Sequence, residues 1–231
     1  MELIWTQPPP PPRQRDLGRA EIVAAAIAVA DEGGAEAVTM KAVAARLGSY
    51  TPMALYRYVR SKDGLVDLML DAAIAEVPVP SAPGLDWHAD LASIATDTRA
   101  MVRRHPWYAA LVHTRPPAGP HTMRRLEFLL RVLVERGATL GAAMTYAAML
   151  DRHIVGSGLQ EAQEARFAAQ HGLDDAASLV AAVRSLHELA AADGRLPLLS
   201  AWLANPSGDS VDAQFTLGLR FLLDGIAAEL S

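Results

Sequence analysis

The chain has 231 residues, of which 51% are hydrophobic and only 6% are aromatic. This length suits one large or two small domains, and an alanine-rich composition with few aromatic residues favours packed helices over sheets. The absence of cysteine excludes disulfide scaffolds, thiolate zinc sites, iron–sulfur clusters and a cysteine nucleophile. The net charge of −5 argues against binding a polyanion through overall charge, so the distribution of charge matters more than its sum.

The N-terminal residues 1–16 contain a run of five prolines, which lack backbone donors and favour an extended conformation. We expect a disordered, Pro-rich tail outside any packed core; the alternative is a partner-docking arm that uses Arg13 and Arg15. The longest apolar run, Ile22–Ala30, is too short to span a membrane, and no secretory signal pattern precedes it. A soluble, cytoplasmic protein is therefore predicted.

Residues 17–77 show four helical patterns in succession. An amphipathic stripe from Leu17 ends at Gly33-Gly34, and Thr39 is placed to cap a short helix over Met40–Leu47. Thr51-Pro52 is a cap followed by proline at the first helical position, which predicts a second short helix that reaches Val59. Two short helices joined by a tight glycine-bearing turn are typical of a helix-turn-helix. Ser61 then caps a helix predicted over Lys62–Val77.

The segment Pro78–Gly84 cannot continue a helix, so it predicts a linker to a second domain over residues 85–231. Every pattern beyond the linker is helical, and the whole chain is therefore predicted to be all-α. The expected helices of the second domain are Trp87–Arg104, Trp107–Val112, Pro120–Arg136, Leu140–Gln170, Ala176–Ala191, Leu198–Leu203 and Val211–Leu230.

Positive charge is concentrated on the predicted helix-turn-helix. The window from Ala37 to Lys62 contains no Asp or Glu, and its basic residues are Lys41, Arg46, Arg57, Arg60 and Lys62. A basic, acid-free patch on an otherwise acidic chain is what a binder of duplex DNA requires. We expect Lys62, Tyr56 and the exposed amides near Thr39 to meet phosphates. The second short helix would enter the major groove and present Thr51, Met53, Ala54, Arg57 and Tyr58 to base edges.

The segment from Leu17 to Val77 resembles the DNA-binding domain of the TetR family of bacterial transcriptional regulators. The matching motifs are Ile22–Ala30 followed by DEGG, then VTMKAVAARLG, ALYRYV and SKDGLVDLML. The resemblance implies that Thr39 and Lys62 contact phosphates, that Tyr56 contacts the DNA backbone, and that Lys41 lies where a base-reading residue is often found. It also implies a regulator controlled by a small molecule.

Two positions depart from the pattern of that family. Six residues, SYTPMA, separate Gly48 from Leu55, one more than expected, so the turn or the start of the recognition helix must differ. We expect this extra residue to push Tyr50 toward the DNA. Gly64 also stands where Glu is common, which removes a capping-box partner for Ser61.

The second domain resembles the same family through HPWYAALV, AAMLDRHIVGSGLQEA and FTLGLRFLLDGIAAEL. The resemblance implies that the long helix and the last helix pair with their counterparts in a second subunit. The physical pattern agrees, because small and apolar residues lie at helical spacing in both segments: Gly156, Gly158, Phe215, Leu219, Leu222, Leu223 and Ile226. The alternative is that these side chains face only the core of their own subunit.

A ligand pocket is expected among the helices from Trp87 to His153. Large apolar or adaptable side chains and a few polar ones recur there: Met101, Arg103, His105, Trp107, Tyr108, Met123, Phe128, Met144, Tyr146, Met149 and His153. Each has an alternative role, since Met and aromatic residues at helical spacing usually pack in a core and a lone His is more often structural.

Catalysis has no support in the sequence. Neither HExxH nor the Glu-x-x-His pairs of di-iron bundles occur, and Gly156-Ser157-Gly158 is neither a P-loop nor a nucleophile elbow. No metal or cofactor is expected. The leading prediction is a homodimeric repressor that binds a palindromic DNA operator and is released by a small-molecule effector. The competing hypothesis is an all-helical small-molecule or protein-binding module without DNA-binding activity, disfavoured by the cluster Arg57, Arg60 and Lys62.

Overall fold

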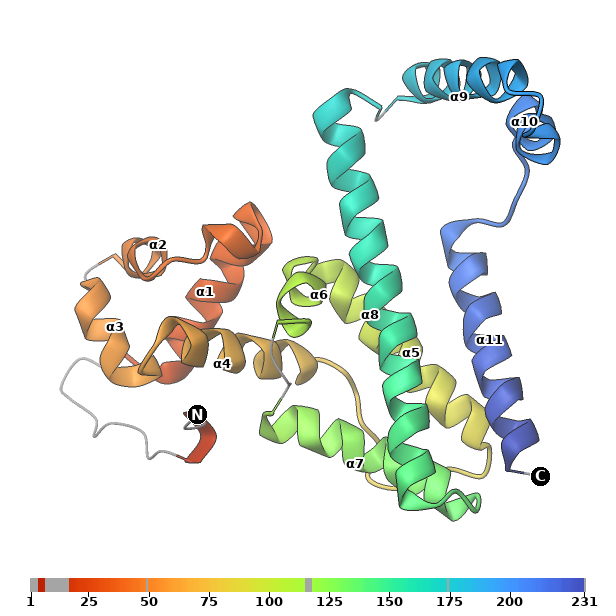
Figure 1. Ribbon diagram of the computed structural model, residues 1–231. Coiled ribbons are helices and arrows are strands. Elements are labelled where there is room, and N and C mark those ends of the chain that lie inside the picture. The colour runs from red at the N-terminus through yellow and green to blue at the C-terminus, as the bar shows by residue number, and fades with distance from the viewer. Residues whose placement is uncertain (1–3, 7–16, 49, 115–117, 174, 231) are drawn as a thin grey trace. The chain divides into compact units, whose positions relative to one another are not determined.

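The computed structural model describes residues 4–6, 17–48, 50–114, 118–173 and 175–230. Within these ranges the chain is built from helices and connecting turns without strands, which confirms the all-α prediction (Figure 1). None of the described helices is long and apolar enough to cross a membrane. The described residues form two compact units, one of residues up to Leu159 together with Leu222 onward and one of Gln160–Phe221.

The first four helices follow the capping pattern of the sequence. Thr39 and Thr51 each accept a hydrogen bond at the side-chain oxygen, from the amides of Ala42 and Ala54 at 3.1 and 3.3 Å. Ser61 does the same for the amide of Gly64 at 2.9 Å. Each cap satisfies an amide that has no partner within its own helix, so each fixes where that helix begins. The helices are α1 (Arg19–Gly33), α2 (Met40–Arg46), α3 (Pro52–Val59) and α4 (Lys62–Ile74), with a 3-10 turn η2 (Ala35–Ala37) after α1.

The rest of the first unit contains longer helices. Asp86 caps α5 (Trp87–Arg104), because its Oδ1 accepts from the Ala89 amide at 3.1 Å. Proline stands at the start of α7, where its missing amide proton costs nothing. These helices are α5, α6 (Trp107–Val112), α7 (Pro120–Glu135), α8 (Leu140–His171), of which the first unit includes the part up to Leu159, and the end of α11 (Val211–Glu229).

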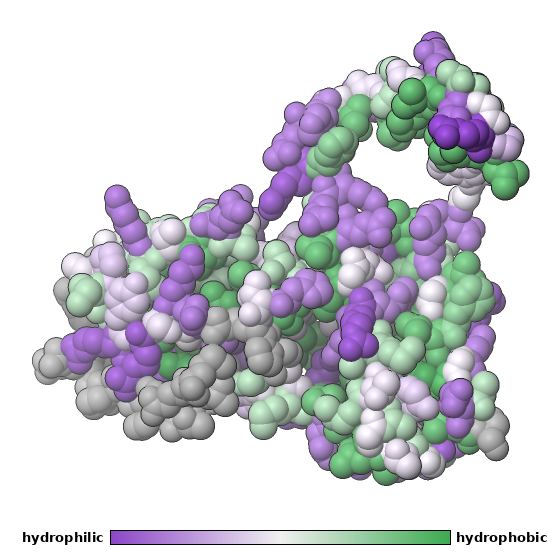
Figure 2. Space-filling view, viewed as in Figure 1, coloured by the Kyte–Doolittle hydropathy of each residue, from purple (hydrophilic) through white to green (hydrophobic). Residues whose placement is uncertain are grey.

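The second unit, residues 160–221, contains the end of α8, α9 (Ala176–Ala192), α10 (Pro197–Ala204) and the start of α11. Asp175 caps α9 by accepting from the Ser178 amide at 2.9 Å. Figure 2 shows hydrophobic residues at the surface over α9 and α10. The exposed large hydrophobic residues of these two helices are Leu179, Val180, Leu186, Leu189, Leu198, Leu199 and Trp202. So much exposed apolar surface in a small unit is typical of an interaction surface.

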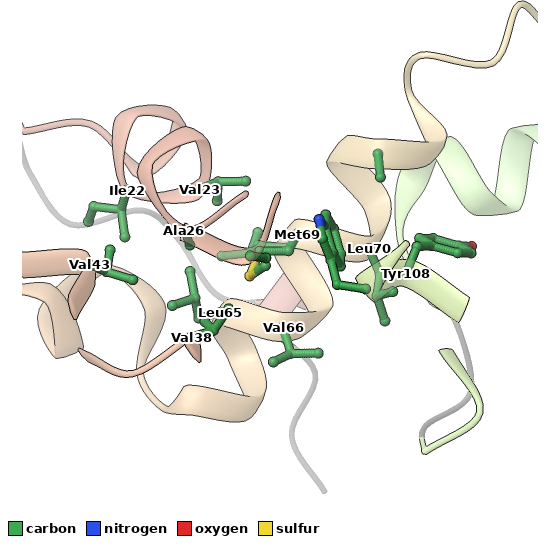
Figure 3. Close-up of a cluster of buried hydrophobic side chains, with 14 of the residues drawn as sticks. Ile22, Val23, Ala26, Val38, Val43, Leu65, Val66, Met69, Leu70 and Tyr108 are labelled. Atoms are coloured by element: carbon green, nitrogen blue, oxygen red, sulfur yellow. The ribbon is translucent and has the colours of Figure 1, made fainter. Parts of the chain in front are cut away.

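One continuous hydrophobic core joins the helix-turn-helix to the helices that follow it. Ile22 of α1, Val43 of α2, Leu55 of α3 and Leu65 of α4 have no exposed surface. The same cluster extends along α4 through Met69 and includes buried residues of α5 and α6 (Figure 3). Since α4 contributes to both ends of this core, a movement of α4 has to disturb the packing on both sides.

Part of the N-terminal segment belongs to this core. Ile4, in a short 3-10 turn η1 (Ile4–Thr6), is 3% exposed and packs in the core, and η1 contacts α4. The expectation that residues 1–16 lie wholly outside the core is therefore wrong for Ile4, because its side chain buries enough apolar surface to hold the turn in place. The proline run and Arg13 and Arg15 lie outside the described residues.

Two glycines of α8, only two residues apart, have different surroundings. A Cβ at Gly158 would collide with Cγ1 of Val102 on α5, whereas a Cβ at Gly156 would meet no neighbouring atom within 4 Å. Gly158 therefore permits close approach of α8 to α5 within the same chain. Gly156 is exposed.

We predict that Gly156→Ala stabilises the protein and Gly158→Ala does not. Both substitutions gain about 1 kcal/mol of helix propensity, but the second also overpacks the Val102 contact at a cost of about 1–3 kcal/mol. Urea denaturation of both variants would measure the difference in unfolding free energy. Equal stabilisation by the two substitutions would show that the packing of α8 against α5 does not require a glycine at position 158.

Candidate functional site

The surface of the helix-turn-helix carries the predicted DNA-contacting side chains. Five of these side chains are exposed and therefore accessible to a molecule that binds this surface: Thr39, Lys41, Thr51, Arg57 and Lys62. On α3 the side chain of Met53 is 75% exposed and that of Tyr56 is 37% exposed. The short α3 therefore presents an outer face of mixed apolar and basic character, with Leu55 and Val59 turned into the core.

Three of the predicted contact residues are less accessible. Ala54 is half-buried, and Tyr50 and Tyr58 are half-buried and pack against the hydrophobic core. The expectation that the extra residue pushes Tyr50 outward is therefore not what the structure shows, because burial of its ring against the core is the more favourable position. The preceding Ser49 lies outside the described residues.

The turn between α3 and α4 explains the unusual Gly64. Arg60 ends α3 with a φ of 65°, and this reversal brings the Val59 carbonyl oxygen onto the first turn of α4. A Cβ at Gly64 would collide with that oxygen. Arg19 of α1 holds the same end of α3, since its Nε donates to the Tyr58 carbonyl at 3.1 Å. Burial and the nearby Arg60 charge lower the pKa of Arg19.

A buried carboxylate connects α4 to the first turn of α7, and we call this contact the α4–α7 junction (Asp71, Gly119, His121 and Thr122). Asp71 is 3% exposed. Its Oδ1 accepts from the amides of His121 and Thr122 at 3.0 and 2.9 Å and from the Thr122 hydroxyl at 3.1 Å. Its Oδ2 lies 2.8 Å from Nδ1 of His121. Asp71 therefore caps the positive end of a helix from another part of the chain.

A second polar contact, the α1–α6 junction, consists of Asp31, Glu76, Arg104, His105 and Trp107. His105 lies between two carboxylates, with Nδ1 2.7 Å from Asp31 and Nε2 3.0 Å from Glu76. Trp107 Nε1 donates to the same Asp31 oxygen at 2.6 Å, and Arg104 Nη2 donates to Glu76 at 2.8 Å. Partial burial raises the pKa of Glu76. Hydrogen bonds from Arg104 and His105 outweigh this effect and hold the pKa of Glu76 below its usual range.

A cavity of about 280 Å³, the α4–α8 cavity, lies within the first unit. Its wall is apolar at Ile74, Val112, Ala148 and Val155. Polar and charged side chains complete the lining: Thr98, Tyr108, His113, Thr122, Arg125, Asp151 and Arg152. An apolar cavity with a few convergent polar groups is typical of a small-molecule site. Thr122 belongs to both this lining and the α4–α7 junction.

Tyr108 alone among the predicted pocket residues lines the α4–α8 cavity. Met101 and Phe128 are buried core residues, and His105 and Trp107 belong to the α1–α6 junction. The others are exposed (Arg103, Met123, Met144 and Met149) or half-buried (Tyr146 and His153). Aromatic and methionine content therefore located the helices of the cavity but not its lining.

The lining residues that the sequence analysis missed include a charged group on an apolar helix face. Arg125 precedes Phe128, Leu129 and Val132 on the buried stripe of α7, and its side chain is 5% exposed. Its Nη2 donates to Asp151 at 2.8 Å and its Nε donates to the Thr98 hydroxyl at 3.1 Å. A charged residue at a core position must be paired or must line a cavity. The arginine at position 125 in an otherwise apolar helix face was therefore the signal in the sequence that could have identified this part of the lining.

The predicted interface residues differ in their exposure. Phe215, Leu219, Leu223 and Ile226 are buried within the chain, as is Gly158, while Leu222 is half-buried. Gly156 is exposed, and so is Phe221 of α11 at 62%. The exposed residues are those of this region that remain available to a second subunit.

Comparison with known proteins agrees with this arrangement of helices. Residues 22–69 match the family described as bacterial regulatory proteins, tetR family, and residues 79–230 match the tetracyclin repressor-like C-terminal domain. The HTH-type transcriptional repressor DrrR1 of Streptomyces coeruleorubidus is 34% identical over 98% of this chain and 84% of its own length. An HTH-type transcriptional regulator of Saccharopolyspora erythraea is 30% identical over 97% of this chain and 91% of its own.

Solved structures show the same fold. The TetR family protein ActR of Streptomyces coelicolor in complex with actinorhodin superposes with a TM-score of 0.77, covers 94% of this chain and all of its own, and is 22% identical. The helix-turn-helix followed by a larger helical domain defines the class, and the chain belongs to the TetR family of bacterial regulatory proteins. It is a DNA-binding transcriptional regulator. Its family members are regulators rather than enzymes, and no cluster able to hold a metal ion occurs among the described residues.

We predict that Lys62→Ala weakens binding to all DNA sequences and lowers the slope of log affinity against log salt by about 1. The reason is that Lys62 is exposed at the start of α4, where it can neutralise a phosphate. Fluorescence anisotropy at several salt concentrations would measure this slope. Arg46→Ala is the matched control, because Arg46 is already paired with Glu32 at 2.8 Å and should change the slope less. Equal slopes for Lys62→Ala and the unmodified protein would contradict the phosphate contact.

Proposed function

We propose that the protein is a repressor that binds a palindromic operator as a homodimer and leaves it when a small molecule occupies the α4–α8 cavity. The observation that carries this proposal is that Thr122 lines the cavity and also binds Asp71 of α4, the helix that follows the helix-turn-helix. Similarity to the repressor DrrR1 supports the direction of regulation. The complex of ActR with actinorhodin supports a small molecule as the effector of this fold.

The proposed DNA contacts divide by role. Thr51 at the N-cap of α3, and Met53 and Arg57 on the exposed face of α3, read base edges in the major groove. The exposed Lys41 of α2 contributes a further base contact. Tyr56, Lys62 and the amides that follow Thr39 bind phosphates and set the position of α3. The DNA-binding domain extends over residues 17–77 and the effector and dimerisation domain over residues 85–231.

A dimer is needed because one α3 of eight residues contacts only a few base pairs. Two copies related by a two-fold axis place their recognition helices about 34–36 Å apart, so that the pair reads an inverted repeat. The exposed apolar surface of α9 and α10 and the exposed Phe221 of α11 are the surfaces that a second copy would cover. We expect Leu223 and Ile226, which are buried, to hold this part of α11 in place for the interface.

Effector release follows from the position of the α4–α7 junction. A ligand that shifts the first turn of α7 changes the amides that Asp71 accepts from, and α4 must follow or lose those hydrogen bonds. Movement of α4 changes the orientation of α3 and thereby the separation of the two recognition helices. The ligand thus favours a population that no longer fits the operator.

The central test is selection of binding sites from a pool of random duplex DNA. The proposal predicts an inverted repeat whose half-site centres lie one helical turn, or a multiple of one turn, apart. Sequencing of the bound fraction would show it. Recovery of a single half-site or of no common sequence would contradict operator recognition by a homodimer.

The dimer surface has its own test. Phe221→Glu should give monomers in light scattering and lose affinity for the inverted repeat, because a charge buried in an interface is costly. Met123→Glu is the matched control, since Met123 on α7 is exposed to a similar extent, 61% against 62%. A dimer that persists in Phe221→Glu would place the interface elsewhere.

The coupling is tested at Asp71. Asp71→Ala should lower the unfolding free energy by about 1–3 kcal/mol, because the partly buried amides of His121 and Thr122 lose their acceptor. Hydrogen exchange of these two amides should become faster. The control Asp86→Ala removes the cap of α5 at a cost of about 1 kcal/mol and should leave them unchanged. Unchanged exchange in Asp71→Ala would refute the junction as the connection between α4 and α7.

A further inference from the structure

The side chain of Tyr108 is buried, and it lines the α4–α8 cavity with a hydroxyl that has no hydrogen-bond partner among the described residues. Tyr108 is 4% exposed and lines the cavity, yet its hydroxyl makes no hydrogen bond to any described residue. Figure 3 shows its oxygen directed away from the labelled core side chains. Burial raises the pKa of this phenol far above its usual value, with Asp151 and Asp71 adding to the effect and Arg125 opposing it. The group is therefore a neutral hydroxyl, able to donate a hydrogen bond to a ligand.

The charges around the cavity favour a negative ligand. Arg125 is neutralised by Asp151, to which its Nη2 donates at 2.8 Å. Arg152, the next residue of α8, also lines the cavity, and no residue in the described ranges pairs with it. Arg125 and Arg152 thus face one aspartate, so these three side chains together carry a net charge of +1. An uncompensated arginine at the rim of an apolar cavity is suited to a carboxylate or enolate.

The size of the cavity limits the ligand. Its volume of about 280 Å³ lies just below the range of about 300–1,000 Å³ of pockets for drug-sized molecules. The apolar wall of Ile74, Val112, Ala148 and Val155 fits a hydrophobic body rather than a sugar or a phosphate ester. A small ligand with an apolar body and one acidic group satisfies all three features.

We infer that the effector is a compact organic anion, with an acidic oxygen bound by Arg152, an apolar body against α4, α6 and α8, and an acceptor oxygen bound by the Tyr108 hydroxyl. This inference rests on the proposed role of the cavity as the effector site. Arg152 selects for charge, whereas Tyr108 recognises an oxygen acceptor whether or not the ligand is charged.

The test uses two probes of the same shape, naphthalene-2-carboxylate and its neutral analogue naphthalene-2-carboxamide, with binding measured by calorimetry. The carboxylate should bind about tenfold more tightly, the difference expected of a charge-assisted hydrogen bond. Arg152→Gln should abolish this preference, whereas Tyr108→Phe should weaken both probes alike and leave the preference in place. Arg124→Gln is the matched control, because Arg124 is exposed on α7 and lies outside the lining, and it should change neither.

Equal affinity for the two probes, absence of binding by both, or a preference that survives Arg152→Gln would overturn the inference. A DNA-release assay with the same carboxylate separates this result from the proposed function. If the carboxylate binds with the expected preference and leaves operator affinity unchanged, the anion site stands and the role of the cavity in release fails. If the carboxylate binds and operator affinity falls, both stand.

Discussion

The structure depends on a carboxylate that is almost completely removed from solvent. Asp71 accepts hydrogen bonds from two amides and a hydroxyl at the start of α7 and contacts the imidazole of His121. A buried charge is tolerated only when such donors surround it, so α4 and α7 cannot separate without leaving the charge unsatisfied. The connection between the helix-turn-helix and the helices that enclose the cavity therefore includes a polar, directional contact in addition to the shared hydrophobic core. Apolar packing alone would allow sliding, whereas these hydrogen bonds fix one register.

The wall of the α4–α8 cavity also contains a polar contact between helices. Arg125 and Asp151 form an ion pair on helix faces that otherwise supply core residues, and Thr98 satisfies a further proton of the guanidinium. Replacing such a pair by apolar residues is often neutral or stabilising, so stability alone gives no reason for it here. Its position in the wall of the cavity supplies a reason, because a guanidinium held on two sides gives that wall a fixed geometry.

Local signals in the sequence predicted the helices well. Thr39, Thr51 and Ser61 cap where short-range capping rules place them, because a cap depends on residues three positions apart. The exposed basic surface followed from an acid-free window in the same way. Apart from Tyr108, the cavity lining could not be predicted from composition, because Thr98, Arg125 and Asp151 become neighbours of the same cavity only through the packing of distant helices. The contacts of His105 and Trp107 could not be predicted for the same reason, because their carboxylate partner Asp31 is more than seventy positions away.

Gly119, which lies against the carboxyl group of Asp71, imposes a constraint on how the sequence can change in evolution. A side chain of any size at Gly119 would collide with the carboxyl group of Asp71. The two positions, far apart in the chain, are therefore not free to change independently in descendants of this protein. Loss of the glycine would first require a shorter residue at position 71, and that residue would abandon the start of α7. Aligned descendants that have lost the glycine should consequently have lost the aspartate as well, so that a side chain at position 119 identifies a lineage that no longer joins α4 to α7 in this way.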